Sequence, residues 1–162
     1  MTSCAIVRRA CLIEANGHLR GPEPDTRTVM AEDELPIVTL YDRIGGEDGV
    51  RRLTQRFYHL MDTLPEATAC RAIHPPSLAG SEAKLFDYLT GWLGGPPLYV
   101  SKHGAPMLRR RHFVAPIGPA ERDGWWLCFE RALDETVADP VLRDIIREPV
   151  RKLADHMMNQ PG

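Results

Sequence analysis

Hydrophobic side chains recur at intervals of three and four residues over most of the chain beyond residue 36, which is the spacing of an amphipathic helix. One run predicts a long helix that Pro65 closes, with an apolar stripe made of Val50, Leu53, Phe57, Leu60, Met61 and Leu64. A second run begins at Ser81, is broken by residues 94–97 (GGPP), and places on one face Leu85, Leu89, Trp92 and Leu93. Residues 66–80, between these runs, are expected to form an irregular corner.

Two shorter helical pieces accompany these runs. Thr39 is expected to cap a short helix over residues 40–44, which Gly45 and Gly46 end. Residues 107–118 (MLRRRHFVAPIG) are expected to begin with one basic helical turn, which the proline and glycine at the end of the run stop.

The last third of the chain predicts two more helices. One begins near Glu121 and faces inward with Trp125, Cys128, Phe129, Ala132, Leu133 and Val137. Asp139 and Pro140 are expected to start the other, which Pro149 should kink and whose apolar positions are Leu142, Ile145, Ile146, Val150, Leu153 and Met157. No segment keeps a strand's period of two over a useful length, so six amphipathic pieces around one core predict an all-α fold.

Residues 1–36 show no sustained periodicity, and residues 21–25 (GPEPD) form a cluster of helix breakers. We therefore expect residues 1–36 to be a disordered extension and residues 37–162 to form one folded domain. The extension is either a tail or the product of a start codon upstream of Met30, and both interpretations stay open.

Charge and cysteine content narrow the class of protein. The net charge is −2 with both signs interspersed, so no broad cationic surface indicates nucleic-acid binding. The four cysteines form no C-x-x-C pair, and no C-x-x-C-H motif for covalent haem attachment occurs. No apolar stretch approaches the ~20 residues of a membrane span, and charges at Arg8, Arg9 and Glu14 argue against a signal peptide. We expect a protein of the reducing cytoplasm with no membrane partner.

His112 is the candidate for cofactor chemistry. A histidine at the end of a short basic turn suits an axial haem ligand, because such a ligand needs a rigid helix, a polar partner for its second nitrogen and cations near the propionates. From these residues alone, a surface arginine cluster with a histidine beside it is the favoured interpretation.

The chain from about Leu40 to Gln160 resembles the truncated haemoglobins, and within them the second group. The resemblance rests on motifs in the family's order, which are Phe57-Tyr58, residues 91–99 (GWLGGPPLY), His103-Gly104, residues 107–118 around His112, Trp125 with Cys128, and residues 156–160 (HMMNQ). It implies a two-over-two helical sandwich around a non-covalent haem b with its iron. The glycine pairs at 45–46 and 94–95 resemble the breaks that shorten this family's helices.

The resemblance makes His112 the proximal iron ligand and assigns the distal side to Tyr58, Trp125 and His74. His74 departs from many members, which carry phenylalanine or tyrosine there, and Ser81 occupies the position from which ordinary globins offer a distal histidine. Each residue has a simpler alternative: a core tyrosine, a tryptophan of an apolar stripe, and a histidine that caps a helix or faces solvent.

Other residues are assigned to the haem's surroundings by the same resemblance. Lys84 and Arg111 are expected near the propionates, with Tyr99 as a hydrogen-bond donor to one of them and Tyr88 closing the distal edge. The apolar wall is expected to consist of Leu85, Leu89, Leu108, Phe113 and Phe129. Cys128 is expected to be core filler rather than a redox thiol.

The expected function follows from the distal donors. Donors such as Tyr58 and Trp125 stabilise the charge on bound dioxygen, so oxygen is expected to leave slowly. Slow release favours chemistry on the bound ligand, either nitric oxide dioxygenation or peroxide reduction, with electrons supplied by an unidentified reductase. Carbon monoxide is a further expected ligand. A gas or redox sensor acting through residues 1–36, and a haem-free helical interaction module, are the two other classes considered.

Overall fold

The computed structural model describes residues 37–161. Within them the chain is helical and contains no strand, which confirms the all-α fold. The elements in chain order are α1 (Leu40–Ile44), α2 (Gly46–Thr63), the 3₁₀ helix η1 (Pro65–Ala67), α3 (Thr68–Ala72), α4 (Ala79–Trp92), α5 (Leu98–His103), α6 (Leu108–His112), α7 (Pro119–Thr136) and α8 (Pro140–Met157). The expected extension at residues 1–36 lies outside the described residues.

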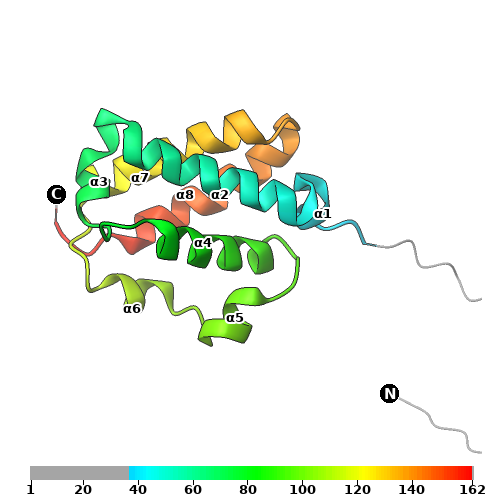
Figure 1. Cartoon of the computed structure of the whole chain (residues 1–162), viewed down its shortest axis with the longest axis horizontal. Helices are drawn as coiled ribbons and strands as arrows, with labels where there is room; N and C mark the ends of the chain where they lie inside the picture. The colour runs from blue at the N-terminus through cyan, green and yellow to red at the C-terminus, as the bar shows by residue number, and fades with distance from the viewer. Residues whose placement is uncertain (1–36, 162) are drawn as a thin grey trace, which may run out of the picture. The chain divides into compact units, whose positions relative to one another are not determined.

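Two helix pairs form the body of the domain, as a two-over-two sandwich requires. Helix α2 packs on both α4 and α7, and α7 packs on α8. In Figure 1, α5 and α6 lie below α4, on the side away from α2. Fully buried side chains from α2, α7 and α8 fill the core, among them Phe57, Leu53, Leu133, Leu142 and Ile146.

The beginning of the domain follows the sequence prediction closely. Thr39 caps α1 in a capping box with Asp42, whose backbone N–H donates to the Thr39 hydroxyl over 3.1 Å. Gly45 ends α1 at φ 98°, in the left-handed region that glycine tolerates. The prediction that Gly46 also ends this helix is wrong, because Gly46 is the first residue of α2.

Three short elements were not predicted, namely η1, α3 and α5, and all of them lie near prolines. Helix η1, which begins at Pro65, leads into the corner expected at residues 66–80, α3 lies within that corner, and α4 begins at Ala79 rather than Ser81. Helix α5 follows two prolines and is tied to α4 by Asp87, a carboxylate only 4% exposed. The Lys102 ammonium donates to Asp87 over 2.7 Å. Tertiary contacts rather than local propensity therefore fix α5.

Two positions in the last helices differ from the predicted apolar faces. Ile145 is 41% exposed, because its face of α8 turns to solvent. Trp126 is more deeply buried than Trp125, at 8% exposed, and the Arg151 guanidinium lies 5.0 Å from the centre of its ring.

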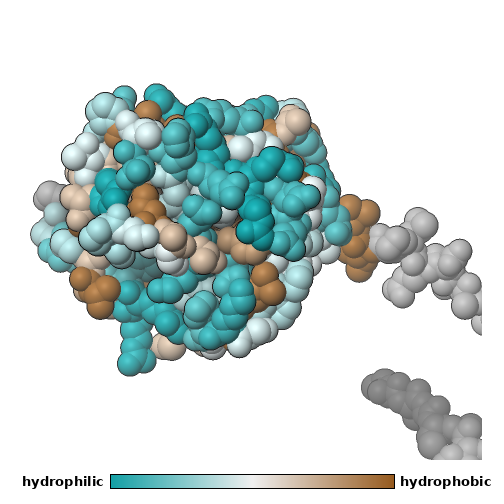
Figure 2. Space-filling model, viewed as in Figure 1, coloured by the Kyte–Doolittle hydropathy of each residue, from teal (hydrophilic) through white to brown (hydrophobic). Residues whose placement is uncertain are grey.

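The face of the molecule seen in Figure 2 is mostly hydrophilic, with small separate hydrophobic patches. None of the helices formed by residues 37–161 is both long and apolar enough to cross a membrane.

Candidate functional site

A cavity of about 540 Å³ lies between the helices, within the size range of small-molecule sites. Nearly all the residues that the sequence marked as functional line it. These are Tyr58, His74, Ser81, Lys84, Leu85, Tyr88, Leu89, Tyr99, Leu108, Arg111, His112 and Trp125. Residues from α2, α4, α6 and α7, far apart in the sequence, therefore meet around one space.

His112 is the last residue of α6, and its imidazole is exposed where it lines the cavity. Its Nδ1 lies 2.7 Å from the carbonyl oxygen of Leu108. A carbonyl only accepts, so Nδ1 carries the proton and Nε2 keeps its lone pair for an outside partner. Met107, which precedes α6, has φ 40° and ψ 44°, a left-handed conformation that an ordinary side chain rarely adopts.

His74 lies in the corner before α4 and is held in a similar way. Its Nδ1 lies 2.8 Å from the carbonyl oxygen of Cys70, so Nδ1 is again the donor and Nε2 the acceptor. Burial lowers the pKa of His74 below its ordinary value, so the ring is neutral at neutral pH. The Arg71 guanidinium fixes the corner by donating to the carbonyls of Pro75 and Pro76 over 3.0 and 2.9 Å, and it pairs with Asp62 over 2.8 Å.

Tyr58 and Trp125 bring hydrogen-bond donors to the cavity wall. The Tyr58 side chain is 7% exposed, and its ring meets Phe57 edge to face with centroids 4.7 Å apart and His74 with centroids 6.3 Å apart. Burial is the main reason that the pKa of Tyr58 lies well above its ordinary value, so the phenol keeps its proton. The Trp125 ring stacks on Phe129 with centroids 5.3 Å apart, and its indole N–H can only donate.

The charged residues at the cavity edge differ in how they are held. The Arg111 guanidinium donates to the carbonyls of Pro106 and His103 over 2.9 and 2.8 Å and lies 5.8 Å from the Tyr99 ring centre. This arginine therefore braces the segment between α5 and α6. Lys84 is exposed on α4. Both cations line the cavity, with Tyr99 beside them.

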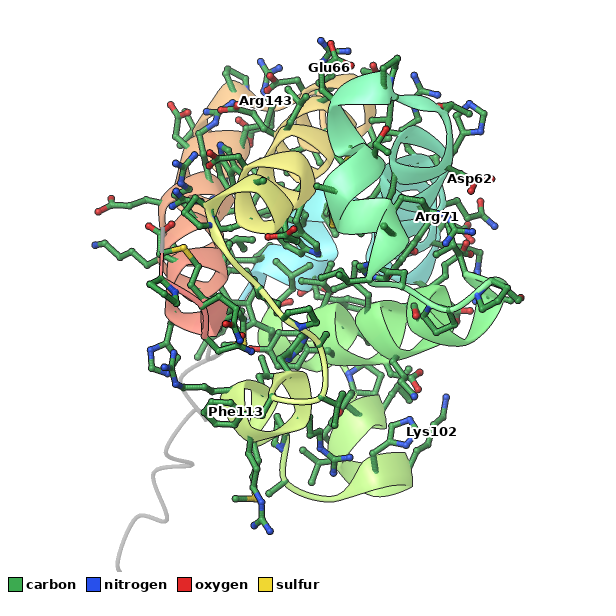
Figure 3. All side chains as sticks on the ribbon, turned by 90° about the vertical axis from the view of Figure 1, so that its left-hand side faces the viewer. Asp62, Glu66, Arg71, Lys102, Phe113 and Arg143 are labelled. Carbon is green, nitrogen blue, oxygen red and sulfur yellow. The ribbon has the colours of Figure 1, made fainter. Side chains whose placement is uncertain are left out.

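Two residues of the predicted apolar wall do not reach the cavity. Phe129 is fully buried in the core between α2 and α7, where its ring also meets Phe57 with centroids 6.2 Å apart. Phe113 is 60% exposed and follows α6 on the outer side, as Figure 3 shows. The Arg109 guanidinium lies 5.6 Å from the centre of its ring. Helical periodicity identified both as apolar positions, but it does not say which apolar surface they meet.

Sequence reasoning also missed part of the lining. One face of α8 contributes Val150, Leu153, Ala154 and Met157, and other unpredicted lining residues include Cys70, Ile73, Trp92, His103, Val114, Ile117 and Arg122. The α8 residues recur at intervals of three and four, which was the available signal, but that signal was assigned to the core.

The described cysteines behave as buried apolar residues. Cys70 and Cys128 are free thiols and almost fully buried. Burial raises the pKa of Cys70 to about 12 and that of Cys128 to about 11. Both thiols therefore stay protonated and unreactive at neutral pH, as expected for Cys128.

The described residues do not offer a metal site of their own. Nowhere in residues 37–161 do three or more His, Cys, Asp or Glu side chains gather closely enough to hold an ion.

Comparison with known proteins gives concordant matches over this domain. The bacterial-like globin family matches residues 39–159. The group 2 truncated haemoglobin YjbI of Bacillus subtilis is 35% identical over 120 residues, which cover 74% of this chain and 88% of the relative.

Solved structures agree with this result. The group II 2-on-2 haemoglobin of Agrobacterium tumefaciens is 72% identical, with a TM-score of 0.75 over 76% of this chain and 95% of that one. The cold-adapted truncated haemoglobin of Pseudoalteromonas haloplanktis TAC125 is 42% identical, with a TM-score of 0.74 over 75% of this chain and 98% of that one.

Proposed function

Because this chain belongs to the bacterial-like globins, and among them to the group 2 truncated haemoglobins, we propose that His112 binds the iron of a non-covalent haem b in the cavity. Membership of the family implies haem with its iron and the binding of gaseous ligands such as oxygen. The further proposal is that the domain retains oxygen strongly and converts nitric oxide or peroxide, rather than carrying oxygen.

The cavity fits this cofactor in three respects. It has space for a large ligand and an aromatic and aliphatic wall from α4, α5 and α8. The imidazole of His112 faces it with an Nε2 lone pair, because Nδ1 is committed to Leu108. Lys84 and Arg111 stand at its edge, where two propionates require cations. When bound, haem supplies an iron that takes a diatomic ligand or peroxide and exchanges electrons with it.

The one observation that carries the proposal is the convergence of His112 with Tyr58, Trp125 and His74 on a single cavity. The Nδ1 bond to Leu108 fixes the ring plane of His112 and makes its Nε2 a stronger ligand. The Tyr58 phenol and the Trp125 indole N–H donate toward a ligand that carries partial negative charge. The Tyr58 phenol is buried and Trp125 is partly buried, and hydrogen bonds in poorly solvated surroundings are strong, which favours slow oxygen release.

His74 favours peroxide chemistry over a purely stabilising role. Nδ1 donates its N–H to the Cys70 carbonyl, so Nε2 of the neutral ring accepts rather than donates. An acceptor at the cavity wall suits removal of a proton from an incoming peroxide. The low pKa of this ring keeps it unprotonated for that role at neutral pH.

Absorbance spectra of the purified protein in ferric, ferrous and carbonyl-bound forms test the haem assignment. His112→Ala is expected to abolish stable haem retention, and His59→Ala, on the exposed face of α2, serves as the matched control. Stoichiometric haem with an unchanged ferrous spectrum in His112→Ala would overturn the assignment. Turnover of nitric oxide or peroxide with a chemical reductant then separates a catalyst from a sensor, which binds without turning over.

A further inference from the structure

Helix α6, which carries His112, is poorly anchored by apolar packing. It has five residues and none of them is buried. A helix of this length is not stable by itself, since isolated helices need about 12–15 residues to be even marginally stable. Its main packing partner is α8. The position of the His112 backbone must therefore depend on polar contacts.

The Asn159 side chain supplies the contact to the His112 backbone and two contacts to the turn that follows α6. The Asn159 Nδ2 donates to the carbonyl of His112 over 3.2 Å and to the carbonyl of Ala115 over 2.9 Å. Its Oδ1 accepts from the backbone N–H of Ile117 over 3.0 Å. The Asn159 backbone N–H also donates to the Ile117 carbonyl over 2.9 Å.

The side-chain amide of Asn159 has one possible orientation. Two carbonyl oxygens face one end and a backbone N–H faces the other, so Nδ2 and Oδ1 are assigned by chemistry. Both Nδ2 protons are used. Arg109 adds a second connection, because its guanidinium donates to the carbonyls of His156 and Met158. The chain after α8 and the segment 107–118 are thus bonded in both directions.

We propose that Asn159 is a positioning residue for the iron ligand: it holds the His112 carbonyl and the turn after α6, and so sets the orientation of the His112 imidazole. The proposal rests on the proposed role of His112. The link is direct, because the Nδ1 bond that orients the ring ends on Leu108, in the same single helical turn. If the end of α6 moves, that bond lengthens and the ring tilts.

Asn159→Ala tests the proposal against a neighbouring control, Gln160→Ala. The Gln160 side chain is exposed and bonds only to the Asn159 amide, over 3.3 Å, whereas its backbone N–H bonds to Ile117 in either variant. In the haem-free protein, hydrogen–deuterium exchange of the Ile117 amide is expected to speed up about fivefold or more in Asn159→Ala only, since one net hydrogen bond is lost.

Measurements on the haem-containing protein distinguish a positioning role of Asn159 from a purely structural one. In Asn159→Ala the iron–histidine stretching band of the ferrous protein is expected to shift to lower frequency and broaden, because the Nδ1 bond to Leu108 weakens. Haem loss to an excess of apomyoglobin is expected to be about fivefold faster. Asn159→Asp retains the acceptor for Ile117 but removes the donors to His112 and Ala115, so the band is expected to shift in this variant too.

The outcomes separate the two proposals. Suppose that Ile117 exchange is faster in Asn159→Ala, while the iron–histidine band and the rate of haem loss are unchanged in both Asn159 variants. Asn159 would then be purely structural, and the inference would be overturned. A parent protein without any iron–histidine band would instead overturn the proposed role of His112, whatever the exchange results. A band shift of equal size in Gln160→Ala would also contradict the assignment to Asn159.

Discussion

Tyr58→Phe removes one hydroxyl from the cavity wall while keeping the aromatic ring. The edge-to-face contacts with Phe57 at 4.7 Å and His74 at 6.3 Å depend on the ring, so they are retained. The raised pKa of Tyr58 means that the group removed is a protonated donor. A hydrogen bond to a ligand with anionic character contributes about 1.5–3 kcal/mol, so oxygen is expected to dissociate roughly one to two decades faster.

Stopped-flow measurement of oxygen dissociation from the ferrous protein tests this value. Tyr41→Phe is the control, because Tyr41 lies on α1 and does not line the cavity. In the double variant Tyr58→Phe with Trp125→Phe, the two effects are expected to be non-additive, since both donors act on one ligand. An unchanged rate in Tyr58→Phe would show that the hydroxyl does not point at the ligand, and the proposed slow release would lose its main cause.

Two predictions concern stability. Burial holds the pKa of His74 below its ordinary 6.5, so the unfolded chain binds a proton before the folded one does as the pH falls. The unfolding free energy therefore falls as the pH drops below about 6.5, by at most ~1.4 kcal/mol per pH unit from this group. Urea unfolding of the haem-free protein at several pH values tests this, because His74→Phe is expected to flatten the dependence of the unfolding free energy on pH in that range. Lys102→Met leaves the buried Asp87 carboxylate without its 2.7 Å partner, so the unfolding free energy is expected to fall by about 1–2 kcal/mol. An unchanged or increased unfolding free energy would contradict this role of Lys102.

The parts of the fold that were predictable are those with local signals. Helix α1 has both a capping residue and a terminating glycine, and α8 has Asp139, whose carboxylate accepts from the N–H groups of Val141 and Leu142. Helices α3 and α5 have neither a side-chain bond at the N-cap nor a long apolar stripe. They exist because distant residues hold them, as Asp87 holds α5, and a pattern of single residues does not contain that information.

The sequence predicted which residues line the candidate site better than it predicted how their side chains are oriented and bonded. The resemblance named His112, Tyr58, His74 and Trp125, and the structure brings all four to one cavity. The sequence did not indicate that His74 is an acceptor, because this depends on which carbonyl meets Nδ1. It also gave no reason to place Asn159 near His112, since the two are 47 residues apart and meet only through the packing of α6 on α8.

The walls of the cavity come from both ends of the folded domain, and this sets a time order for its assembly. Tyr58 is on α2, whereas Met157 and Asn159 are among the last residues to leave the ribosome in this domain. Translating from one end of the site to the other takes roughly 5–20 seconds at ~5–20 residues per second, while single helices form in about a microsecond or less. During that interval the nascent chain has Tyr58 but lacks the α8 wall of the cavity. Capture of the proposed cofactor is therefore expected to follow synthesis of α8, because Leu153, Ala154 and Met157 complete the cavity wall.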